Sequence, residues 1–486
     1  MKKKSLKKNV FFSVLKVFLS LIFPLITFPY ASRILLPEGI GKVNFANTIV
    51  NYFVLIASLG IGGYATREAV KIRDNKQALT KFFKEIISIN TICCIIAYCL
   101  FFIALFFIPK LSEYQSLLLI CSINILFSIL TIDWLYTANE EFKYLTIRSF
   151  IVQLLCVVYL FIFVKTKDDV IYYALFGVLI NVGNNLLNFI LVNKYVDFKM
   201  KIKLDIKKHI KSIFIFWGIT VVTSIYSLFD TTMLGFLSTN EEVGYYTAST
   251  KLVHMILSML TAITAVLLPR LTDYAQNKET DIFNELVKKT SNILILLSIP
   301  ITAGIIILSK PLILLLSGEP YLRSIPSMII ISPIILIISF GSLIGAQVLP
   351  ALGKENLSFY SYIAGALTNI TINTILIPKL GALGAAIGTV CAEFCVTTTQ
   401  IIFVRKIIFH KEYLITLLKS ILASLIMSVI LIFSMRLISK IILQLLVSFF
   451  LGIFSYSILL YIMKEKYFIL YIQKALNFIS KNNKKV

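Results

Sequence analysis

Lys251 and His254 are the residues whose types and spacing most directly suggest chemistry. They lie three positions apart in an apolar segment at 245–268, so an α-helix places them about one turn apart on one face. A charge near the centre of a bilayer costs roughly 2.5 to 3.5 kcal/mol, so a binding role is expected for it. An ammonium group beside a titratable imidazole suits an anionic ligand such as phosphate. An internal ion pair, for example of Lys251 with Asp230, is the alternative.

Other apolar segments also carry polar side chains at helical spacing. Lys16 lies in the segment 10–32, and Asn47 and Asn51 lie one turn apart in the segment 42–65. Such groups must face protein or water in a membrane, so they indicate a cavity that binds a polar substrate. As alternatives, the amides only join neighbouring helices, and the Lys16 ammonium extends to the cytoplasmic interface.

Asp230 and Glu393 are the candidate ion-coupling carboxylates. Asp230 lies near the end of the segment 212–237, and Glu393 lies in the middle of the segment 382–404. A desolvated carboxylate can bind and release a proton near neutral pH, so either residue could couple an ion gradient to a conformational change. Hydrogen bonds from neighbouring hydroxyl groups are the structural alternative for Glu393.

Fourteen apolar segments must position these residues, and they predict an all-α polytopic membrane protein. The 486-residue chain is 58% hydrophobic with a mean hydropathy of +0.88, and a helix needs about 20 apolar residues to cross a bilayer. The segments lie at 10–32, 42–65, 86–108, 116–138, 145–164, 170–193, 212–237, 245–268, 291–316, 325–350, 357–378, 382–404, 416–435 and 441–463.

The basic residues predict the orientation of the chain in the membrane. Of the 47 Lys and Arg, 34 lie in the termini and in or beside the even-numbered loops, and only 10 lie in or beside the odd-numbered loops. By the positive-inside rule both termini are cytoplasmic. This bias accounts for most of the net charge of +23, and the basic face would attract anionic lipid headgroups. No basic cluster is interleaved with aromatic residues, so nucleic-acid binding is not expected.

An internal repeat predicts two similar lobes. A shift of 203 positions places Glu38-Gly-Ile-Gly41 on Glu241-Glu-Val-Gly244, and Arg67 on Arg270. Six helices per repeat keep both halves in one orientation, so we expect two parallel six-helix lobes about a pseudo-two-fold axis along the membrane normal. The expected parts are a lobe at 1–195, a cytoplasmic linker at 196–210, a lobe at 211–405, two extra helices at 406–463 and a basic tail at 464–486.

Arg67 and Arg270 follow equivalent segments at the cytoplasmic face. They are candidates for an inner gate or for steering a charged headgroup into the cleft, and ordinary anchoring by inside-positive residues is the alternative. The sequence has no phosphate-binding loop and no metal-ligand spacing, so neither ATP hydrolysis, a metal site nor another cofactor is expected. The odd-numbered connections are too short for a catalytic domain, which favours transport over catalysis.

Several local motifs resemble those of one known family. They are Phe28-Pro-Tyr-Ala-Ser-Arg33-Ile-Leu with Pro37-Glu-Gly-Ile-Gly41, Asp133-Trp-Leu-Tyr-Thr-Ala-Asn-Glu140 continuing to Arg148, Leu228-Phe-Asp230-Thr-Thr-Met-Leu-Gly235, Val243-Gly-Tyr-Tyr-Thr-Ala-Ser-Thr-Lys251, and Gly381-Ala-Leu-Gly-Ala-Ala-Ile-Gly388. With these motifs, residues 8–410 resemble the O-antigen (Wzx-type) polysaccharide flippases of the multidrug/oligosaccharidyl-lipid/polysaccharide (MOP) superfamily. The motif that begins at Asp133 is the most specific of them.

The resemblance implies a flippase of a bacterial plasma membrane. It would move an undecaprenyl-pyrophosphate-linked oligosaccharide from the inner to the outer leaflet by alternating access, and Arg33 joins the expected substrate-binding residues. Expected partners are membrane lipids, a proton or sodium ion, and the polymerase and chain-length proteins of the same pathway; a monomer is expected by analogy. Passive flipping stays open, as do a cation-coupled multidrug antiporter, a flippase for the peptidoglycan lipid precursor and a membrane glycosyltransferase or ligase.

Overall fold

The computed structural model describes residues 6–405 and 411–483. Within these ranges it describes the side chains of all residues except 6–7, 10, 215–216, 219–227, 411 and 475–483. The described chain is helical, and no β-strand occurs in it. It divides into two compact units, Met1–Gly244 and Tyr245–Val486, and each is considered by itself.

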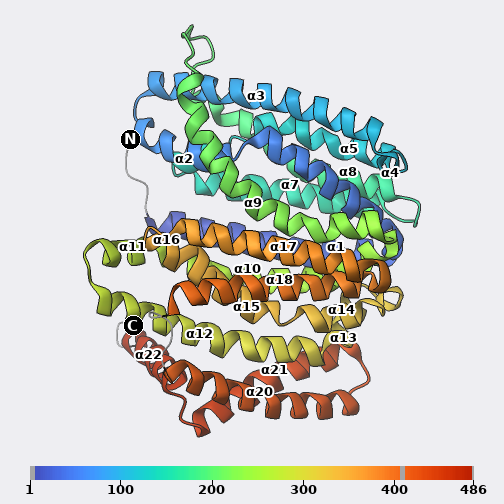
Figure 1. The fold of residues 1–486 in the computed structure, drawn as a ribbon, viewed down its shortest axis with the longest axis vertical. Helices are drawn as coiled ribbons and strands as arrows, with labels where there is room; N and C mark the ends of the chain where they lie inside the picture. The colour runs from blue at the N-terminus through green and yellow to red at the C-terminus, as the bar shows by residue number, and fades with distance from the viewer. Residues whose placement is uncertain (1–5, 406–410, 484–486) are drawn as a thin grey trace. The chain divides into compact units, whose positions relative to one another are not determined.

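The first unit is a bundle in which α1 is central. α1 contacts α3, α5, α7, α8 and α9, which Figure 1 labels. The elements are α1 (Leu6–Ser58), α2 (Ile61–Ile72), α3 (Lys76–Phe107), α4 (Pro109–Ser112), α5 (Gln115–Phe127), η1 (Ser128–Leu130), α6 (Asp133–Ala138), α7 (Phe142–Phe163), α8 (Val170–Leu187), η2 (Asn188–Lys194), α9 (Lys207–Leu237) and the beginning of α10 (Asn240–Ala265).

The second unit contains the rest of α10 and a bundle in which α12, α17 and α18 make the most extensive helix contacts. Tyr456 Oη on α21 donates to Leu296 O on α12 at 2.9 Å, so the last helices pack on this bundle. The elements are α11 (Leu268–Gln276), α12 (Thr280–Ile307), α13 (Ser309–Leu316), η3 (Glu319–Tyr321), α14 (Ser324–Ile331), α15 (Ile334–Gly341), η4 (Ser342–Val348), α16 (Leu349–Ala351), α17 (Glu355–Leu380), α18 (Ala382–Phe403), α20 (Lys411–Leu437), α21 (Ile441–Ile462) and α22 (Lys466–Asn483).

The described residues contain twelve helical stretches long and apolar enough to span a membrane, where the sequence predicts fourteen segments. The stretch Phe11–Ile72 covers two of the predicted segments, since α1 continues through the loop expected at 33–41. The predicted segment 212–237 corresponds to α9, of which only Leu228–Leu237 contributes a described apolar helix. The fold is therefore an all-α polytopic membrane protein, and fourteen spans remain a prediction.

A single-residue break replaces the expected first outer loop. Leu36 has φ 60° and ψ 175° and divides α1 into two helices. Pro37 explains its position, because a proline lacks the amide hydrogen that an uninterrupted helix would use and disfavours helical geometry in the residue before it.

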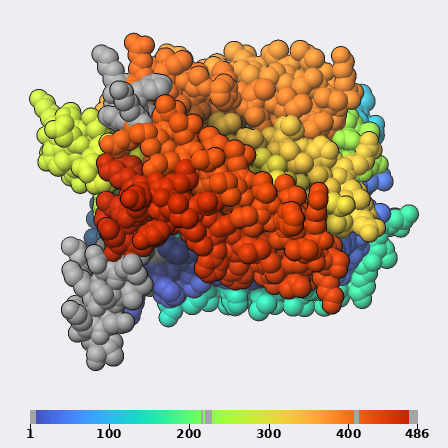
Figure 2. Space-filling view, turned by 90° about the horizontal axis from the view of Figure 1, so that it is seen from below, coloured from blue at the N-terminus to red at the C-terminus, as the bar shows by residue number. Residues whose placement is uncertain are grey.

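The surface and interior of each unit suit a lipid environment. Large apolar side chains such as Phe106 and Leu437 are exposed, whereas Glu85 and Asn188 are fully buried. In the second unit, α20, α21 and α22 lie at the surface that Figure 2 shows. Exposed apolar and buried polar residues indicate that lipid surrounds the helices and that the polar groups face protein.

Two glycines allow a very close contact between α1 and the first turn of α10. A Cβ atom at Gly41 would lie 1.7 Å from Asn240 O, and a Cβ atom at Gly244 would lie 2.1 Å from Pro37 O. The contact is reciprocal, because the shift of 203 positions carries Pro37 onto Asn240 and Gly41 onto Gly244.

Candidate substrate site

A charged cluster lies inside the first unit and includes one predicted site residue, Lys16. Asp133 accepts from Arg148 through both carboxylate oxygens, with 3.0 Å from Nη1 to Oδ1 and 3.3 Å from Nη2 to Oδ2. The Lys16 ammonium lies 3.5 Å from Asp133 Oδ2. We call Lys16, Asp133, Arg148, Asn184 and Asn188 the Asp133 cluster.

Two amides hold the arginine in place. Arg148 Nε donates to Asn184 Oδ1 at 3.2 Å, and Nη1 also donates to Asn188 Oδ1. Asn188 Nδ2 in turn donates to Asp133 Oδ1 at 3.0 Å. The Arg148 side chain is only 3% exposed, so its guanidinium is committed to partners inside the unit. Arg148 therefore positions Asp133 and is not accessible to a ligand.

Lys16 differs from Arg148 in access and in spare hydrogen-bonding capacity. Its side chain is 39% exposed, and an ammonium group has three donors. Two cations face one carboxylate, so the cluster carries a net positive charge at its open side. This arrangement suits the recognition of an anionic group such as a phosphate.

A break in a membrane span positions Asp133. Between η1 and α6 the backbone leaves helical geometry at Thr131 and Ile132, and Asp133 is the first residue of α6. Transporters commonly bind their substrates where membrane helices are discontinuous, because the break frees polar groups to line a cavity. Lys16 comes from α1, Arg148 from α7 and the two amides from the end of α8 and the start of η2.

The sequence from Asp133 to Arg148 joins several elements at the end of the unit. Arg73 Nη1 donates to Ala138 O at 2.8 Å and to Glu140 Oε1 at 2.9 Å. Lys194 Nζ donates to Glu141 Oε1 at 2.8 Å. The carboxylates of this motif, in the turn between α6 and α7, thus connect that turn to the end of α2 and to η2, which gives the motif a structural role.

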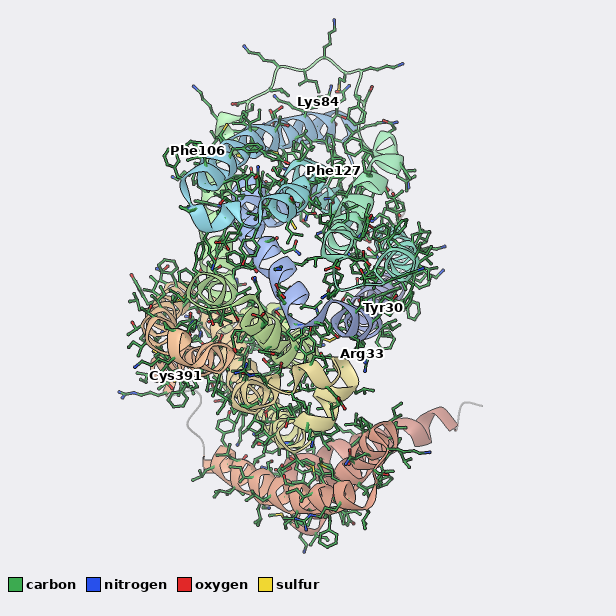
Figure 3. All side chains as sticks on the ribbon, turned by 90° about the vertical axis from the view of Figure 1, so that its right-hand side faces the viewer. Tyr30, Arg33, Lys84, Phe106, Phe127 and Cys391 are labelled. Carbon is green, nitrogen blue, oxygen red and sulfur yellow. The ribbon has the colours of Figure 1, made fainter. Side chains whose placement is uncertain are left out.

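The other predicted residues of the first unit lie away from the Asp133 cluster. Arg33 is exposed on α1, one turn from Tyr30, and donates to Pro29 O at 3.1 Å (Figure 3). Lys16 and Arg33 are separated by about 25 Å of helix, since each residue adds about 1.5 Å, so they do not form one site. Asn47 is half-buried and Asn51 is exposed, both beyond the break in α1.

Asp230 and Arg67 are also in the first unit. Asp230 is buried on α9, two residues from Thr232, whose hydroxyl group lies 2.9 Å from Tyr52 Oη on α1. Arg67 is exposed on α2 and its Nε lies 3.0 Å from Glu68 Oε1. The predicted gate residue Arg67 is therefore part of a local surface ion pair.

The second unit brings two predicted residues to neighbouring helices. Tyr246 Oη on α10 and Thr389 Oγ1 on α18 are 3.0 Å apart. Lys251 follows Tyr246 by five residues and is half-buried, and Glu393 follows Thr389 by four and is half-buried. The Thr389 hydroxyl also donates to Ala385 O at 2.9 Å in its own helix.

His254 and Arg270 are exposed in the second unit. His254 lies one turn after Lys251 on α10, as the spacing predicts, and Arg270 lies on α11. Over the part of the chain that the structure describes, no group of three or more His, Cys, Asp or Glu could hold a metal ion.

The sequence alone predicts no role in the site for Asp133, Arg148, Asn184 or Asn188. The signal was present, because Asp133, Arg148 and Asn184 lie within predicted apolar segments, where ionisable and amide groups need partners. Their pairing could not be derived, since four separate elements contribute to it.

The sequence of the chain is similar to those of proteins named for polysaccharide biosynthesis or O-antigen transport. The family described as polysaccharide biosynthesis protein matches residues 6–275, and the MatE family matches residues 218–375. A putative O-antigen transporter of Escherichia coli K12 is 25% identical over 410 residues, which cover 83% of this chain and 98% of that protein. The capsular polysaccharide biosynthesis protein CapF of Staphylococcus aureus is 24% identical over 385 residues, covering 76% and 92%.

The fold is similar to those of solved transporters. The lipid II flippase MurJ in an inward closed conformation aligns with a TM-score of 0.75 at 18% identity, covering 93% of this chain and 98% of that one. An inward-facing multidrug resistance transporter of the MATE family aligns with a TM-score of 0.60 at 16% identity, covering 79% and 93%. Because the first family matches more than half of the sequence, the chain belongs to the polysaccharide biosynthesis protein family, which is a transporter family rather than a family of enzymes.

Proposed function

We propose that this protein is a flippase for an undecaprenyl-pyrophosphate-linked oligosaccharide in a bacterial plasma membrane. It would carry the repeat unit of an O-antigen, capsule or related polysaccharide from the inner to the outer leaflet, with both termini in the cytoplasm. Its relatives support this substrate class, since they are named as O-antigen and capsular polysaccharide proteins and are matched over most of their length.

The half-exposed Lys16 in the Asp133 cluster is the observation that carries the proposal. A pyrophosphate headgroup is anionic, and the cluster presents a net positive charge from within a helical bundle. The half-buried Lys251 supplies a second candidate cation in the other unit. A multidrug antiporter for organic cations would be expected to present a net negative site, so the cluster favours an anionic substrate.

Alternating access would follow from the internal repeat. The lobe 1–195 would rock against the lobe 211–405 about a pseudo-two-fold axis along the membrane normal. The reciprocal contact of Gly41 with Asn240 and of Gly244 with Pro37 supports such an axis. Arg67 and Arg270, shifted by the same 203 positions, would guide the headgroup at the cytoplasmic face.

An ion gradient is a further element of the proposal. Ionisable groups lie within both units. Asp230 is buried in the first unit, and Glu393 and Lys251, the latter one turn from His254, are half-buried in the second. Asp230, His254 or Glu393 would bind a proton or sodium ion in exchange for the substrate. Passive flipping, driven by removal of the product outside, needs none of them.

Flipping in proteoliposomes tests the proposed function. The substrate is an undecaprenyl-pyrophosphate-oligosaccharide with a fluorescent label on the sugar, and an added quencher reports the fraction in the outer leaflet under imposed proton or sodium gradients. We expect Lys16→Ala and Lys251→Ala each to slow flipping at least about tenfold, since a hydrogen bond to a charged group contributes roughly 1.5 to 3 kcal/mol.

Lys165→Ala is the matched control, because Lys165 is exposed in a short connection outside the Asp133 cluster. It removes the same charge and should leave the rate unchanged. Absence of flipping by folded wild-type protein would reject this substrate. Flipping of the peptidoglycan lipid precursor, or export of cationic dyes, would then support one of the two related transporters.

A further inference from the structure

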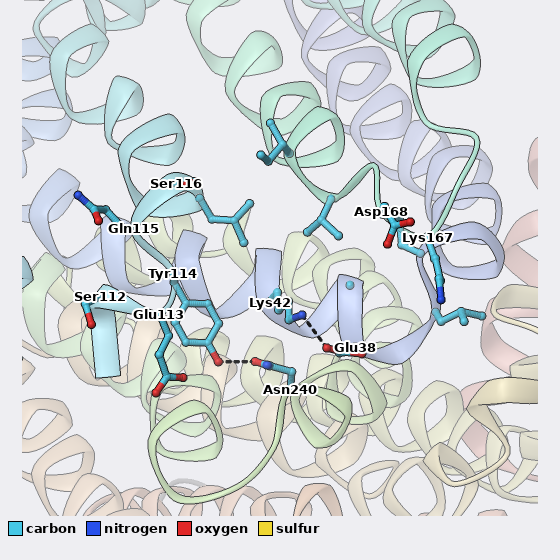
Figure 4. Close-up of a pocket in the computed structure, with 16 residues that line it drawn as sticks. Glu38, Lys42, Ser112, Glu113, Tyr114, Gln115, Ser116, Lys167, Asp168 and Asn240 are labelled. Atoms are coloured by element: carbon cyan, nitrogen blue, oxygen red, sulfur yellow. Dashed lines mark hydrogen bonds and ion pairs between the residues drawn. The ribbon is translucent and has the colours of Figure 1, made fainter. Parts of the chain in front are cut away.

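A polar cavity lies in the first unit, away from the Asp133 cluster. It has a volume of about 760 Å³ and is lined from four places: the break in α1, the turn between α4 and α5, the segment before α8 and the start of α10 (Figure 4). We call it the outer cavity, because the charge bias of the loops places these four connections outside the cytoplasm. Its size is within the range of small-molecule binding sites.

Two interactions stabilise the wall of the outer cavity. Lys42 Nζ lies 2.6 Å from Glu38 Oε1, and Tyr114 Oη donates to Asn240 Oδ1 at 2.7 Å. The second bond joins the turn before α5 to the first residue of α10. Burial raises the pKa of the Tyr114 phenol, so the phenol remains a donor at physiological pH.

The remaining polar lining groups are open to a ligand. The side chains of Glu113, Gln115, Ser116, Lys167 and Asp168 are exposed, and among the described residues none of them makes a hydrogen bond or ion pair. Carboxylates accept hydrogen bonds, ammonium groups donate them, and amides and hydroxyls do both. Such a set matches the many hydroxyl groups of a sugar, each of which is both donor and acceptor.

The charge of the outer cavity argues against other ligand classes. Three carboxylates, on Glu38, Glu113 and Asp168, face two ammonium groups, on Lys42 and Lys167, so the lining is weakly negative and does not favour a pyrophosphate. The Tyr114 ring is buried, and among the described residues that line the cavity there is no other aromatic side chain to stack on a flat drug. Neutral sugar rings, which need many hydrogen bonds and no strong charge, fit the cavity best.

We propose that the outer cavity binds the sugar residues of the lipid-linked oligosaccharide on the outer side of the membrane. This inference rests on the proposed function and adds a glycan site that is separate from the pyrophosphate site around Lys16. Sugar binding here stabilises the state in which the headgroup has crossed, because a ligand shifts a protein towards the conformation that it binds more tightly.

Protection of an introduced thiol tests the outer cavity. The full-length protein with Ser116→Cys is reconstituted and labelled with a membrane-impermeant maleimide, and the labelling of the native cysteines is measured in the unsubstituted chain and subtracted. The probe is the soluble oligosaccharide released by mild acid from the lipid-linked substrate of the flipping assay. We expect saturating oligosaccharide to slow labelling several-fold.

Two variants make the test specific. Thr166→Cys lies in an exposed connection outside the cavity lining, and its labelling should not change with added oligosaccharide. We also combine Glu113→Ala and Asp168→Ala with Ser116→Cys. Half-maximal protection of this variant should need at least about tenfold more oligosaccharide, since both acidic residues supply charged hydrogen-bond acceptors. Both acidic residues are exposed, so these substitutions should leave the fold intact.

The outcomes separate this inference from the proposed function. Normal flipping by the wild type without protection of Ser116→Cys would overturn the glycan site and leave the flippase standing. Protection that persists in the variant lacking Glu113 and Asp168 would also overturn it, because the assigned groups would not be the ones that bind. Failure of the wild type to flip the lipid, with protection retained, would reject the flippase and support a carbohydrate-binding cavity alone.

Discussion

Residues of the Asp133 cluster contribute differently to the stability of the protein and to transport, and substitutions can separate the two contributions. Arg148→Ala should lower the free energy of unfolding by about 3 kcal/mol, because it leaves a carboxylate and two amides without their buried partner. Lys16→Ala should lower it by less than about 1 kcal/mol, since the Lys16 ion pair is half-exposed. Denaturant unfolding in detergent measures both, and equal losses of stability would contradict this division.

The flipping rates of variants at these residues should rank differently from their stabilities. Lys16→Ala should slow flipping strongly in a protein of nearly normal stability, which assigns Lys16 to the substrate. Lys16→Arg should restore part of the rate by restoring the charge. A normal rate in Lys16→Ala would remove the cluster from the site and leave it a structural network.

The residues of the site could be predicted only in part from the sequence. A lysine inside an apolar segment is costly, so Lys16 and Lys251 could be recognised without a structure. Whether Arg33 belongs to the same site as Lys16 could not be predicted, because their separation depends on α1 being helical as far as the break at Leu36. Asp133 and Arg148 are 15 residues apart in sequence, but their pairing depends on the break before α6, which no periodicity indicates.

At the scale of helices, the crossing of α1 and α10 depends on the absence of two side chains. Gly41→Ala should destabilise the protein by about 1 to 3 kcal/mol, because its Cβ would overlap Asn240 O and the helices would have to separate. Gly244→Ala should have a similar effect through Pro37 O. Thermal unfolding of the purified variants measures both losses.

Gly62→Ala is the matched control for these glycine substitutions. Gly62 is exposed in α2, and a Cβ atom there would meet nothing within 4 Å. Alanine is favoured over glycine inside a helix, so this variant should be as stable as the wild type or slightly more stable. Equal behaviour of Gly41→Ala and Gly62→Ala would show that the close contact does not limit stability.

The linker before α9 is held against α3 by hydrogen bonds from the Lys84 side chain to two backbone carbonyls. Lys84 Nζ donates to Phe198 O at 2.9 Å and to Met200 O at 2.6 Å, and Figure 3 shows Lys84 beside this segment. Lys84→Ala should release the segment and speed tryptic cleavage after the exposed lysines between 199 and 203 about tenfold, since proteolysis requires local opening. Lys81→Ala, on the same helix, is the control, and equal cleavage of both variants would contradict this role.

Helices were easier to predict than their boundaries. Apolar runs of about 20 residues located most of the spans, because burial in lipid determines their length. The first outer loop was wrongly expected, since Pro37 was read as part of a loop, although a proline can also follow a sharp break between two helices. The end of α2, after residue 65, and the first residues of α3 lie between the predicted segments 42–65 and 86–108, because their charged side chains hide the helical pattern.

For the whole molecule, the distribution of basic residues predicts one orientation for both halves of the chain. An even number of spans in each repeat keeps the repeats parallel, so the connections near Thr166 and Glu319 should both face outward, and those near Gln77 and Asn277 inward. All four residues are exposed. Single cysteines at Thr166 and Glu319 should react with an impermeant maleimide in intact bacterial spheroplasts, whereas cysteines at Gln77 and Asn277 should react only after permeabilisation. The opposite pattern would place the outer cavity in the cytoplasm, where it could not receive a sugar that has crossed, whereas mixed labelling within one pair would contradict the parallel repeat.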